Sequence, residues 1–446
     1  MTATQDPPTR TPSKGRPEEG LARGIGTTGV AMIALNGIIG AGIFGVPAGA
    51  AALAGAWSPL VFVACALLLA AIMLCFAEIS SRFTRTGGPI VYVGEAFGHF
   101  AGFQTGWAFF IARVTSFAAN ISLLLASLAW FWPAADSGPT RVALLALFIG
   151  GLTWINVAGV RGAVRLLGGL TVLKLLPLLA LVAFGLGWLD ESVEAWIAAP
   201  APGIADFGTA ALLVVYAFVG WESALIPAGE TRDPARAMPR ALLGALAVAT
   251  VLYVTIQMIS VAALPGLAES DAALVDVAAV LMGPTGAVLL TAGVVISVTG
   301  NLAASMISSP RMTFAMARDG DLPARLGRVH PEHRTPANAI IATSVIVFVL
   351  SVFGSFLWLA AMSALVRVLI YMGCIAAMPR LRRKASDLDA PGFELRGGWT
   401  IPVVALLASG LLLIQLSWQS LAATVAVVAA GSVIFLLMHR RAHASD

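Results

Sequence analysis

The stretch that decides the fold is VAMIALNGIIGAGIFGVP, residues 30–47, which carries four glycines and ends on a proline. It lies within an apolar run from residue 27 to residue 53. Glycine and proline destabilise a helix interior, and lipid cannot satisfy the backbone groups that an unwound segment frees, so such a segment must face protein or a water-filled cavity. The N–H groups that begin the second half-helix would suit an anionic group such as a carboxylate. Close packing between helices, which small residues also permit, is the alternative explanation.

A second apolar run is interrupted in the same way. Residues 212–230 read LLVVYAFVGWESALIPAGE, with a glycine at mid-depth followed by an acidic residue. Interrupted runs at corresponding positions of two halves are the sequence pointer to a transporter site. Gly42 and Gly220 are 178 residues apart, and five spans separate the starts of the two units, so the units have opposite orientations. The pattern predicts a five-plus-five inverted repeat followed by two further helices.

The composition agrees with a membrane protein. Of 446 residues, 59% are hydrophobic and 11% are charged, whereas soluble domains are about 45–50% apolar and about 25% charged. An ordinary cytosolic enzyme and a disordered chain are therefore excluded. The runs are continuously apolar, which favours helices of roughly 20 residues over a β-barrel. We predict an all-α polytopic membrane protein with twelve transmembrane helices, at about 27–53, 57–80, 100–132, 141–160, 163–188, 208–230, 239–264, 286–315, 337–355, 357–379, 400–417 and 419–438.

Basic residues alternate from loop to loop. Lys and Arg gather in the N-terminal tail and after each even-numbered span, whereas the opposite connections hold only Arg141. The positive-inside rule then places both termini in the cytoplasm. We divide the chain into a disordered cytoplasmic tail (1–26), a first repeat of spans 1–5 (27–188), a second repeat of spans 6–10 (189–383), and spans 11–12 with a short cytoplasmic C-terminus (384–446).

Other partners and cofactors find little support in the sequence. The basic residues are spread over short loops, so we expect no nucleic-acid partner. The three cysteines lie inside apolar stretches, and His330 and His333 are joined by no cysteine. We therefore expect neither a metal site nor a cofactor.

Four segments, two of them within the stretches quoted above, carry a specific resemblance. They read GAGIF at 40–44, RTGGPIVYVGEAFG at 85–98, FVGWES at 218–223 continuing to GETRDPARAMPRA at 229–241, and SPRMTFAMARDG at 309–320, followed by His330-Pro and Thr335-Pro. In this order, and at these topological places, they resemble the amino acid–polyamine–organocation (APC) superfamily, and the chain looks like a bacterial amino acid permease. The similarity spans roughly residues 22–440, nearly the whole chain.

The resemblance implies a LeuT-like fold, alternating access and an amino acid bound between spans 1 and 6. It places the substrate carboxylate at the backbone of span 1, around Ile39, Gly40, Ala41, Gly42 and Ile43. It places the substrate ammonium at backbone carbonyls beside Gly220, on Ala217, Phe218 and Val219. Tyr216 falls where relatives often have an aromatic residue that closes over the substrate, although simple packing explains it equally well. Trp221 adjoins the break in span 6 and would shape the pocket.

Ionisable residues inside the spans need partners, because unpaired charge there costs about 3 kcal/mol or more. The resemblance places Lys174 where sodium-coupled members of the fold hold a sodium ion, within reach of span 1 carbonyls and of hydroxyls on span 8, with Ser297, Thr299 and Ser305 as candidates. Lys174 is then a fixed or proton-titrating cation, or a charge that only pins spans 1, 5 and 8.

The other ionisable residues leave more than one role open. Glu222 is either a cap for the half-helix dipole or a proton-linked gate. Arg367 either pairs with Glu222 or lines the inner vestibule, and Arg113 has a structural partner. We expect Glu78 and Glu95 to be solvated or interfacial.

The function predicted from these features is secondary active amino acid transport across the bacterial cytoplasmic membrane, coupled to protons or to exchange. The chain carries no phosphate-binding glycine loop, so nothing suggests coupling to ATP. As a permease, it is not expected to be an enzyme. Apart from Glu222, no acid near the breaks could hold a cationic side chain of the substrate. This favours neutral amino acids over polyamines. A polyamine or cationic amino acid antiporter is the alternative, and a channel or a non-transporting membrane sensor the alternative from another class. The oligomeric state stays open.

Overall fold

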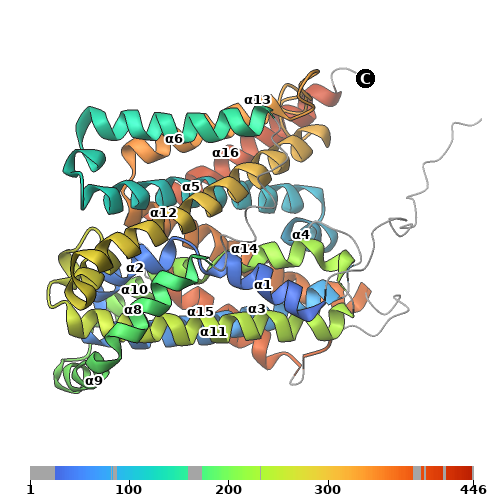
Figure 1. Ribbon diagram of the computed structural model, residues 1–446. Coiled ribbons are helices and arrows are strands. Elements are labelled where there is room, and N and C mark those ends of the chain that lie inside the picture. The colour runs from blue at the N-terminus through green and yellow to red at the C-terminus, as the bar shows by residue number, and fades with distance from the viewer. Residues whose placement is uncertain are drawn as a thin grey trace, which may run out of the picture.

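The computed structural model describes residues 26–81, 83, 88–158, 173–231, 233–384, 393–395, 398–414 and 418–443. Within these ranges every regular element is an α-helix or a short 3-10 helix (Figure 1). The predicted tail, except for Gly26, lies outside the described residues, and so do most of the basic connection after span 2 and residues 159–172, where span 5 was predicted to begin.

The helices follow one another along the chain with short connections. They are α1 (Thr27–Ile38), α2 (Gly42–Ala54), α3 (Ser58–Ser81), α4 (Pro89–Phe97), α5 (His99–Ala129), α6 (Gly138–Ala158), α8 (Leu175–Gly185), α9 (Leu189–Ala198), α10 (Ile204–Phe218), the 3-10 helix η4 (Trp221–Glu230), α11 (Pro234–Ala263), α12 (Ala273–Arg318), α13 (Ala337–Phe353), α14 (Phe356–Lys384), α15 (Thr400–Ile414) and α16 (Trp418–His443).

The described helices have the length and surface of membrane-spanning segments. Eight helical stretches are long and apolar enough to cross a bilayer, and four shorter apolar helices (α1, α10, α13 and α15) accompany them. Large apolar side chains point outward, among them Leu67, Trp154 and Phe353, which are 69%, 72% and 85% exposed. Such a surface would be unfavourable against water but suits lipid. The chain is therefore an all-helical polytopic membrane protein.

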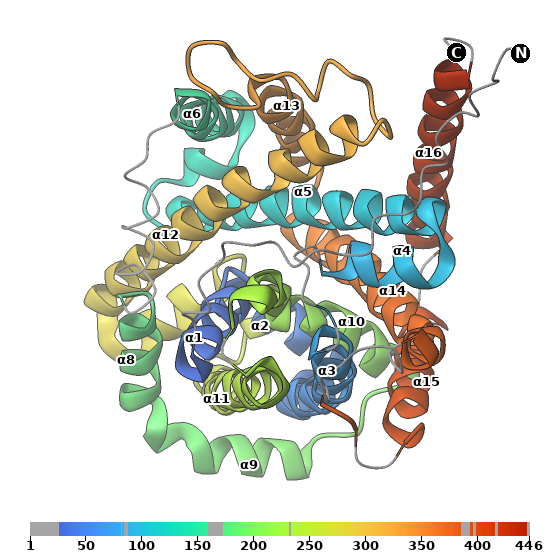
Figure 2. The ribbon, with the colours of Figure 1, turned by 90° about the vertical axis from the view of Figure 1, so that its right-hand side faces the viewer.

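The predicted interruptions of spans 1 and 6 are both present. The helix α1 ends at Ile38 and α2 begins at Gly42, while α10 ends at Phe218 and η4 begins at Trp221. Figure 2 shows α1, α2, α10, α3 and α11 grouped on one side, with α5, α12, α13 and α6 on the other. The interruptions thus lie inside the protein, where side chains from the second group can reach the freed backbone.

The two breaks touch each other through glycine. A Cβ on Gly37 would lie 2.2 Å from the carbonyl oxygen of Gly220, and a Cβ on Gly220 would lie 2.3 Å from the carbonyl oxygen of Gly37. Gly220 also has a φ of +109°, a conformation that side chains disfavour. A Cβ on Gly42 would lie 2.5 Å from Cα of Ala217. Close backbone approach therefore explains these glycines, in addition to the breaks themselves.

Three helical segments were not among the predicted spans. The helices α4 and α9 are short, and α9 lies along one edge of the molecule in Figure 2; its first turn carries Asp190 and Glu191. The third segment precedes Gly283, where α12 has a φ of +66°, so that α12 begins 13 residues before the predicted span. Each segment is too short to stand out as a membrane span.

The expectation that Glu78 is solvated was wrong. Its side chain is 1% exposed and receives two hydrogen bonds from Arg382, of 2.6 and 2.7 Å, and one from the backbone N–H of Leu395. The basic end of α14 folds against α3, which buries this carboxylate in a bidentate pair. Glu95 is partly exposed and lies 3.6 Å from Lys384.

Candidate functional site

A cavity of about 280 Å³ lies where the two breaks meet. Its wall is formed by both breaks together with α5, Lys174, α12 and α14. The predicted site residues that line it are Gly40, Ala41, Gly42, Lys174, Tyr216, Val219, Gly220 and Glu222. Among the described residues, the lining leaves out Ile39, Ile43, Ala217, Phe218 and Trp221.

Lys174 holds the end of the first half of span 1. Its Nζ donates to the carbonyl oxygen of Asn36 at 2.9 Å, to Oδ1 of Asn36 at 2.6 Å, and to the carbonyl oxygen of Ile39. The last carbonyls of a helix have no partner inside the helix and carry its negative partial charge. An ammonium has three N–H donors, and these three acceptors use all of them.

The second half of span 1 presents donors instead. The first hydrogen bond closed at the start of α2 comes from Phe44 N–H to the carbonyl of Ala41, so the N–H groups of Gly42 and Ile43 precede the hydrogen-bonded ladder of α2. Ser297 of α12 donates to the carbonyl of Gly40 at 3.5 Å, whereas Lys174 bonds to Asn36 and Ile39 within the described part of the chain. Gly42 lines the cavity, so the N-terminal end of α2 presents a backbone donor there that the helix does not use.

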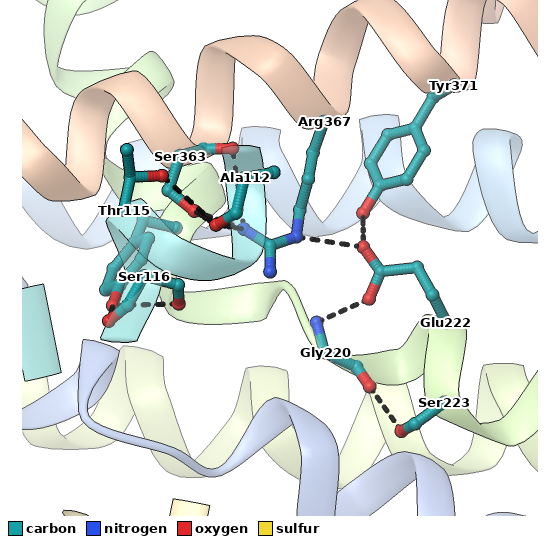
Figure 3. Close-up of polar contacts among 10 residues, drawn as sticks. Ala112, Thr115, Ser116, Gly220, Glu222, Ser223, Ser363, Arg367 and Tyr371 are labelled. Carbon is teal, nitrogen blue, oxygen red and sulfur yellow. Dashed lines mark hydrogen bonds and ion pairs between the residues drawn. The ribbon is translucent and has the colours of Figure 1, made fainter. Parts of the chain in front are cut away.

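Glu222 holds the start of the second half of span 6. Its Oε2 accepts a hydrogen bond of 2.7 Å from the backbone N–H of Gly220, and its Oε1 accepts one from the hydroxyl of Tyr371. Arg367 Nε lies 3.3 Å from Oε1, and the side chains of Arg367 and Glu222 are 7% and 3% exposed. Figure 3 shows this buried pair bridging α14 and the break, with Ser223 donating to the carbonyl of Gly220. Of the two roles considered for Arg367, the pair with Glu222 is present, and Arg367 also lines the cavity between the breaks.

Tyr216 is tied to α5. Its hydroxyl donates to Oδ1 of Asn120 at 2.6 Å and lies 3.3 Å from the hydroxyl oxygen of Ser116. Its ring packs edge-on against Phe356, with centroids 6.0 Å apart. Tyr216 therefore lines the cavity in a position fixed by hydrogen bonds and ring packing.

The aromatic residues that flank the second break point away from the cavity. Phe218 packs against Phe62 and Tyr253, with ring centroids 6.2 and 5.1 Å away. Trp221 is fully buried and packs against Phe76 and Tyr371, at 5.1 and 5.4 Å. Trp221 thus supports the break from behind and does not form the cavity wall.

Several lining residues were not identified from the sequence. Asn36, Asn120 and Asn301 are amides within apolar runs, and Cβ on Gly40 would lie 2.7 Å from Nδ2 of Asn301. An amide inside a membrane helix needs a polar partner, so these three asparagines could have been identified from the sequence as candidate cavity residues. Ser308 of α12 also lines the cavity and has no such distinguishing context in the sequence.

Arg113 of α5 points into the same cavity. Its Nη1 donates to the hydroxyl of Ser308 at 2.6 Å, and its guanidinium lies over the ring of Phe109, 5.0 Å from the centroid. Its buried Nε has no hydrogen-bond partner among the described residues. Arg113 thus has two neutral partners, the hydroxyl of Ser308 and the aromatic ring of Phe109.

One group of side chains outside the cavity has the spacing of metal ligands. Ligand atoms of His99, Asp321 and His439 lie within 4.8 Å of one another, and His99 Nε2 is 2.8 Å from Asp321 Oδ1. The three residues come from distant parts of the sequence, which is why their spacing gave no motif. Their hydrogen bond links α5 to the loop that follows α12.

Comparisons with known proteins agree with this architecture. The amino acid permease family model matches residues 25–438. The serine/threonine exchanger SteT of Bacillus subtilis is 31% identical over 354 residues, which cover 75% of this chain and 78% of SteT. The branched-chain amino acid permease BcaP of the same organism is 26% identical over 446 residues, 95% of this chain and 94% of BcaP. The large neutral amino acids transporter small subunit 2 of Oryctolagus cuniculus is 28% identical over 415 residues, 90% and 76% of the two chains.

The matched region contains both breaks and the whole lining of the cavity between them. Apolar helices, paired interruptions and extended sequence similarity all lead to the same assignment. The chain belongs to the amino acid permease family of the APC superfamily and is an integral membrane protein for amino acid transport.

Proposed function

We propose that the chain is a secondary active transporter that carries amino acids by alternating access, with the substrate bound between the breaks of spans 1 and 6. The observation that carries this proposal is the cavity where the two breaks meet. A substrate seated there would contact backbone from both halves of the chain, which is what a conformational change between the halves needs.

The polarity of the two breaks supports an amino acid in particular. At the first break Lys174 neutralises the carbonyls of α1, and the free N–H groups of α2 suit the substrate carboxylate. At the second break Glu222 satisfies the N–H of Gly220, and the last carbonyls of α10 suit the substrate ammonium. A zwitterion with adjacent carboxylate and ammonium groups matches both.

The topology that we propose has twelve spans. The broken pairs α1–α2 and α10–η4 are spans 1 and 6, and α3, α5, α6, α8, α11, α12, α13, α14, α15 and α16 are the others. Spans 1–5 and 6–10 then form a LeuT-like inverted repeat over 27–188 and 189–383, with spans 11 and 12 in 384–446. The distribution of Lys and Arg supports cytoplasmic termini in a bacterial cytoplasmic membrane.

Coupling is assigned to Lys174 and Glu222. Lys174 is buried against the span 1 carbonyls, and loss of its charge would release those carbonyls. Its protonation would therefore change the backbone that binds substrate. The relative SteT is named as an exchanger, which supports exchange as the second mode of transport. Glu222 links the break in span 6 to α14, as a gate between the halves requires.

The alternatives have less support. Among the described lining residues Arg113, Lys174 and Arg367 are basic and Glu222 alone is acidic, which disfavours a polyamine or a cationic amino acid. The relatives are named as exchanger, permease and transporter, which supports a carrier over a channel or a sensor.

Counterflow in proteoliposomes tests the proposal. Purified protein is reconstituted, the vesicles are loaded with one unlabelled amino acid at a time, and uptake of the labelled form is followed. A carrier gives accelerated, saturable uptake for at least one amino acid, whereas linear uptake that preloading does not change would contradict it. Vesicles without protein give the background.

A further inference from the structure

The charges that line the cavity do not balance. Three lining side chains in the described part of the chain are basic and one is acidic. Arginine cannot lose its proton in a protein, so the charges of Arg113 and Arg367 are permanent. A buried charge needs a partner, because an uncompensated one is strongly unfavourable. The positive excess therefore calls for an anion from outside the protein.

Two of the three cations already have partners. Lys174 directs all of its donors to Asn36 and Ile39 at the end of α1. Arg367 pairs with Glu222 through Nε, and its Nη1 donates to Ser363 and to the carbonyl of Ala112. The single carboxylate is thus held by Arg367, by Tyr371 and by the backbone of the break.

Arg113 is the cation without a counter-charge. It forms no ion pair with any residue in the described ranges, and its only hydrogen bond goes to Ser308. Arg367 donates to the carbonyl of Ala112, the residue that precedes Arg113, so the two arginines lie near each other. The ring of Phe109 covers one face of its guanidinium and does not cover the edge that carries the N–H groups.

Arg367 offers a second donor to the same space. Its Nη2 has no hydrogen-bond partner among the described residues, and no dashed line reaches it in Figure 3. Both arginines line one cavity with the two breaks. A carboxylate between them would receive charge-assisted hydrogen bonds from two sides, the arrangement in which such bonds are strongest.

We propose that the substrate is an acidic amino acid whose side-chain carboxylate binds between Arg113 and Arg367. The inference rests on the proposed function, because it presumes that the α-carboxylate and the ammonium occupy the two breaks. It departs from the sequence-based expectation of a neutral amino acid, which considered only the acids near the breaks and not the arginines on α5 and α14.

Paired substrates of equal shape provide the test. Proteoliposomes containing the full chain are assayed for counterflow with labelled L-glutamate and L-aspartate and with their neutral amides, L-glutamine and L-asparagine. We expect half-saturation by each acid at concentrations roughly tenfold or more below those of its amide, because the amide leaves the guanidinium charge unpaired. This comparison uses the unmodified protein and does not depend on the folding of any variant.

Substitution of Arg113 locates the subsite. In Arg113→Gln, half-saturation by glutamate should rise roughly tenfold or more, and by a much larger factor than half-saturation by glutamine. Arg113→Lys, which keeps the charge without the planar fork, should recover part of the preference. The matched control is Arg380→Gln. Like Arg113, Arg380 makes one hydrogen bond, of 2.9 Å to the carbonyl of Ala96, and lies over an aromatic ring, 4.8 Å from the centroid of Phe97, but it is outside the cavity.

The outcomes separate the inference from the function on which it rests. Counterflow of neutral amino acids without preference for the acids would overturn the inference and leave the proposed function standing. An Arg113→Gln variant that weakens glutamate and glutamine equally would reduce Arg113 to a structural residue, and so would overturn it as well. Absence of counterflow with every amino acid would overturn both.

Discussion

The two breaks differ in which end of the interrupted backbone the protein itself neutralises. At the first break a cation, Lys174, binds the carbonyls that end α1. At the second break an anion, Glu222, binds an N–H that precedes η4. Under the proposed function, the opposite polarity at each break is left for the substrate, N–H groups at the first break and carbonyls at the second. The comparison leads us to propose that a pair of broken helices favours a zwitterion when the protein itself neutralises one polarity at each break.

The largest effect is expected from filling the contact between the breaks. Gly220→Ala would place a methyl group 2.3 Å from the carbonyl oxygen of Gly37, at a φ of +109°. We expect loss of folded protein or transport below detection, because backbone atoms on both sides must move. The thermal stability of purified protein and its counterflow measure this.

The matched control is Gly244→Ala, since a Cβ there meets nothing within 4 Å. It should leave transport unchanged and stabilise α11 by a few tenths of a kcal/mol up to about 1 kcal/mol. Equal tolerance of both substitutions would mean that the breaks are not in contact.

Removal of the cation at the first break comes next. Lys174→Ala leaves the carbonyls of Asn36 and Ile39 without their donor, so we expect transport to be abolished or uncoupled from the proton gradient while the protein still inserts. Uptake driven by an imposed pH difference, compared with counterflow, measures the coupling. Full uptake with its normal pH dependence in this variant would rule out the coupling role.

A smaller effect is expected at the second break. Glu222→Gln keeps an acceptor for the N–H of Gly220 but leaves Arg367 without its counter-charge, which should lower stability by about 3 kcal/mol. Tyr371→Phe removes only one hydrogen bond to the same carboxylate and should cost about 1–2 kcal/mol. If the two variants had equal stability, the ion pair would contribute nothing beyond a neutral contact.

The smallest effect is expected from a single hydroxyl at the second break. Ser223→Ala removes a hydrogen bond of 2.6 Å to the carbonyl of Gly220, worth about 1 kcal/mol. Transport should stay within about twofold of the unmodified protein, as measured by the initial rate of counterflow. A loss as large as that of Lys174→Ala would indicate that Ser223 contacts substrate directly.

The breaks could be predicted from sequence because their cause is local. Glycine and proline within an apolar run conflict with a continuous helix wherever the run is placed, and the run at 30–47 is interrupted where its glycines lie. The short helices α4 and α9 were missed because each has no more than ten residues, too few to stand out against the spans.

The chemistry of the cavity could be predicted only in part. Lys174 and Glu222 stood out because isolated charges in apolar runs need partners, but the partners themselves come from other helices. Trp221 illustrates the limit: its place beside Gly220 suggested a pocket wall, whereas the orientation of the 3-10 turn directs its ring toward Phe76 and Tyr371. The direction of a side chain depends on local helix type, which the residue pattern does not reveal.

The pairing of opposite polarities at the breaks can be tested with substrate fragments. The amino acid that gives the strongest counterflow is compared, as a competitor of labelled uptake, with its decarboxylated amine and with its deaminated acid. If the first break binds the carboxylate and the second the ammonium, each fragment should compete roughly tenfold or more weakly than the intact amino acid. Competition by either fragment as strong as that of the amino acid itself would contradict the account.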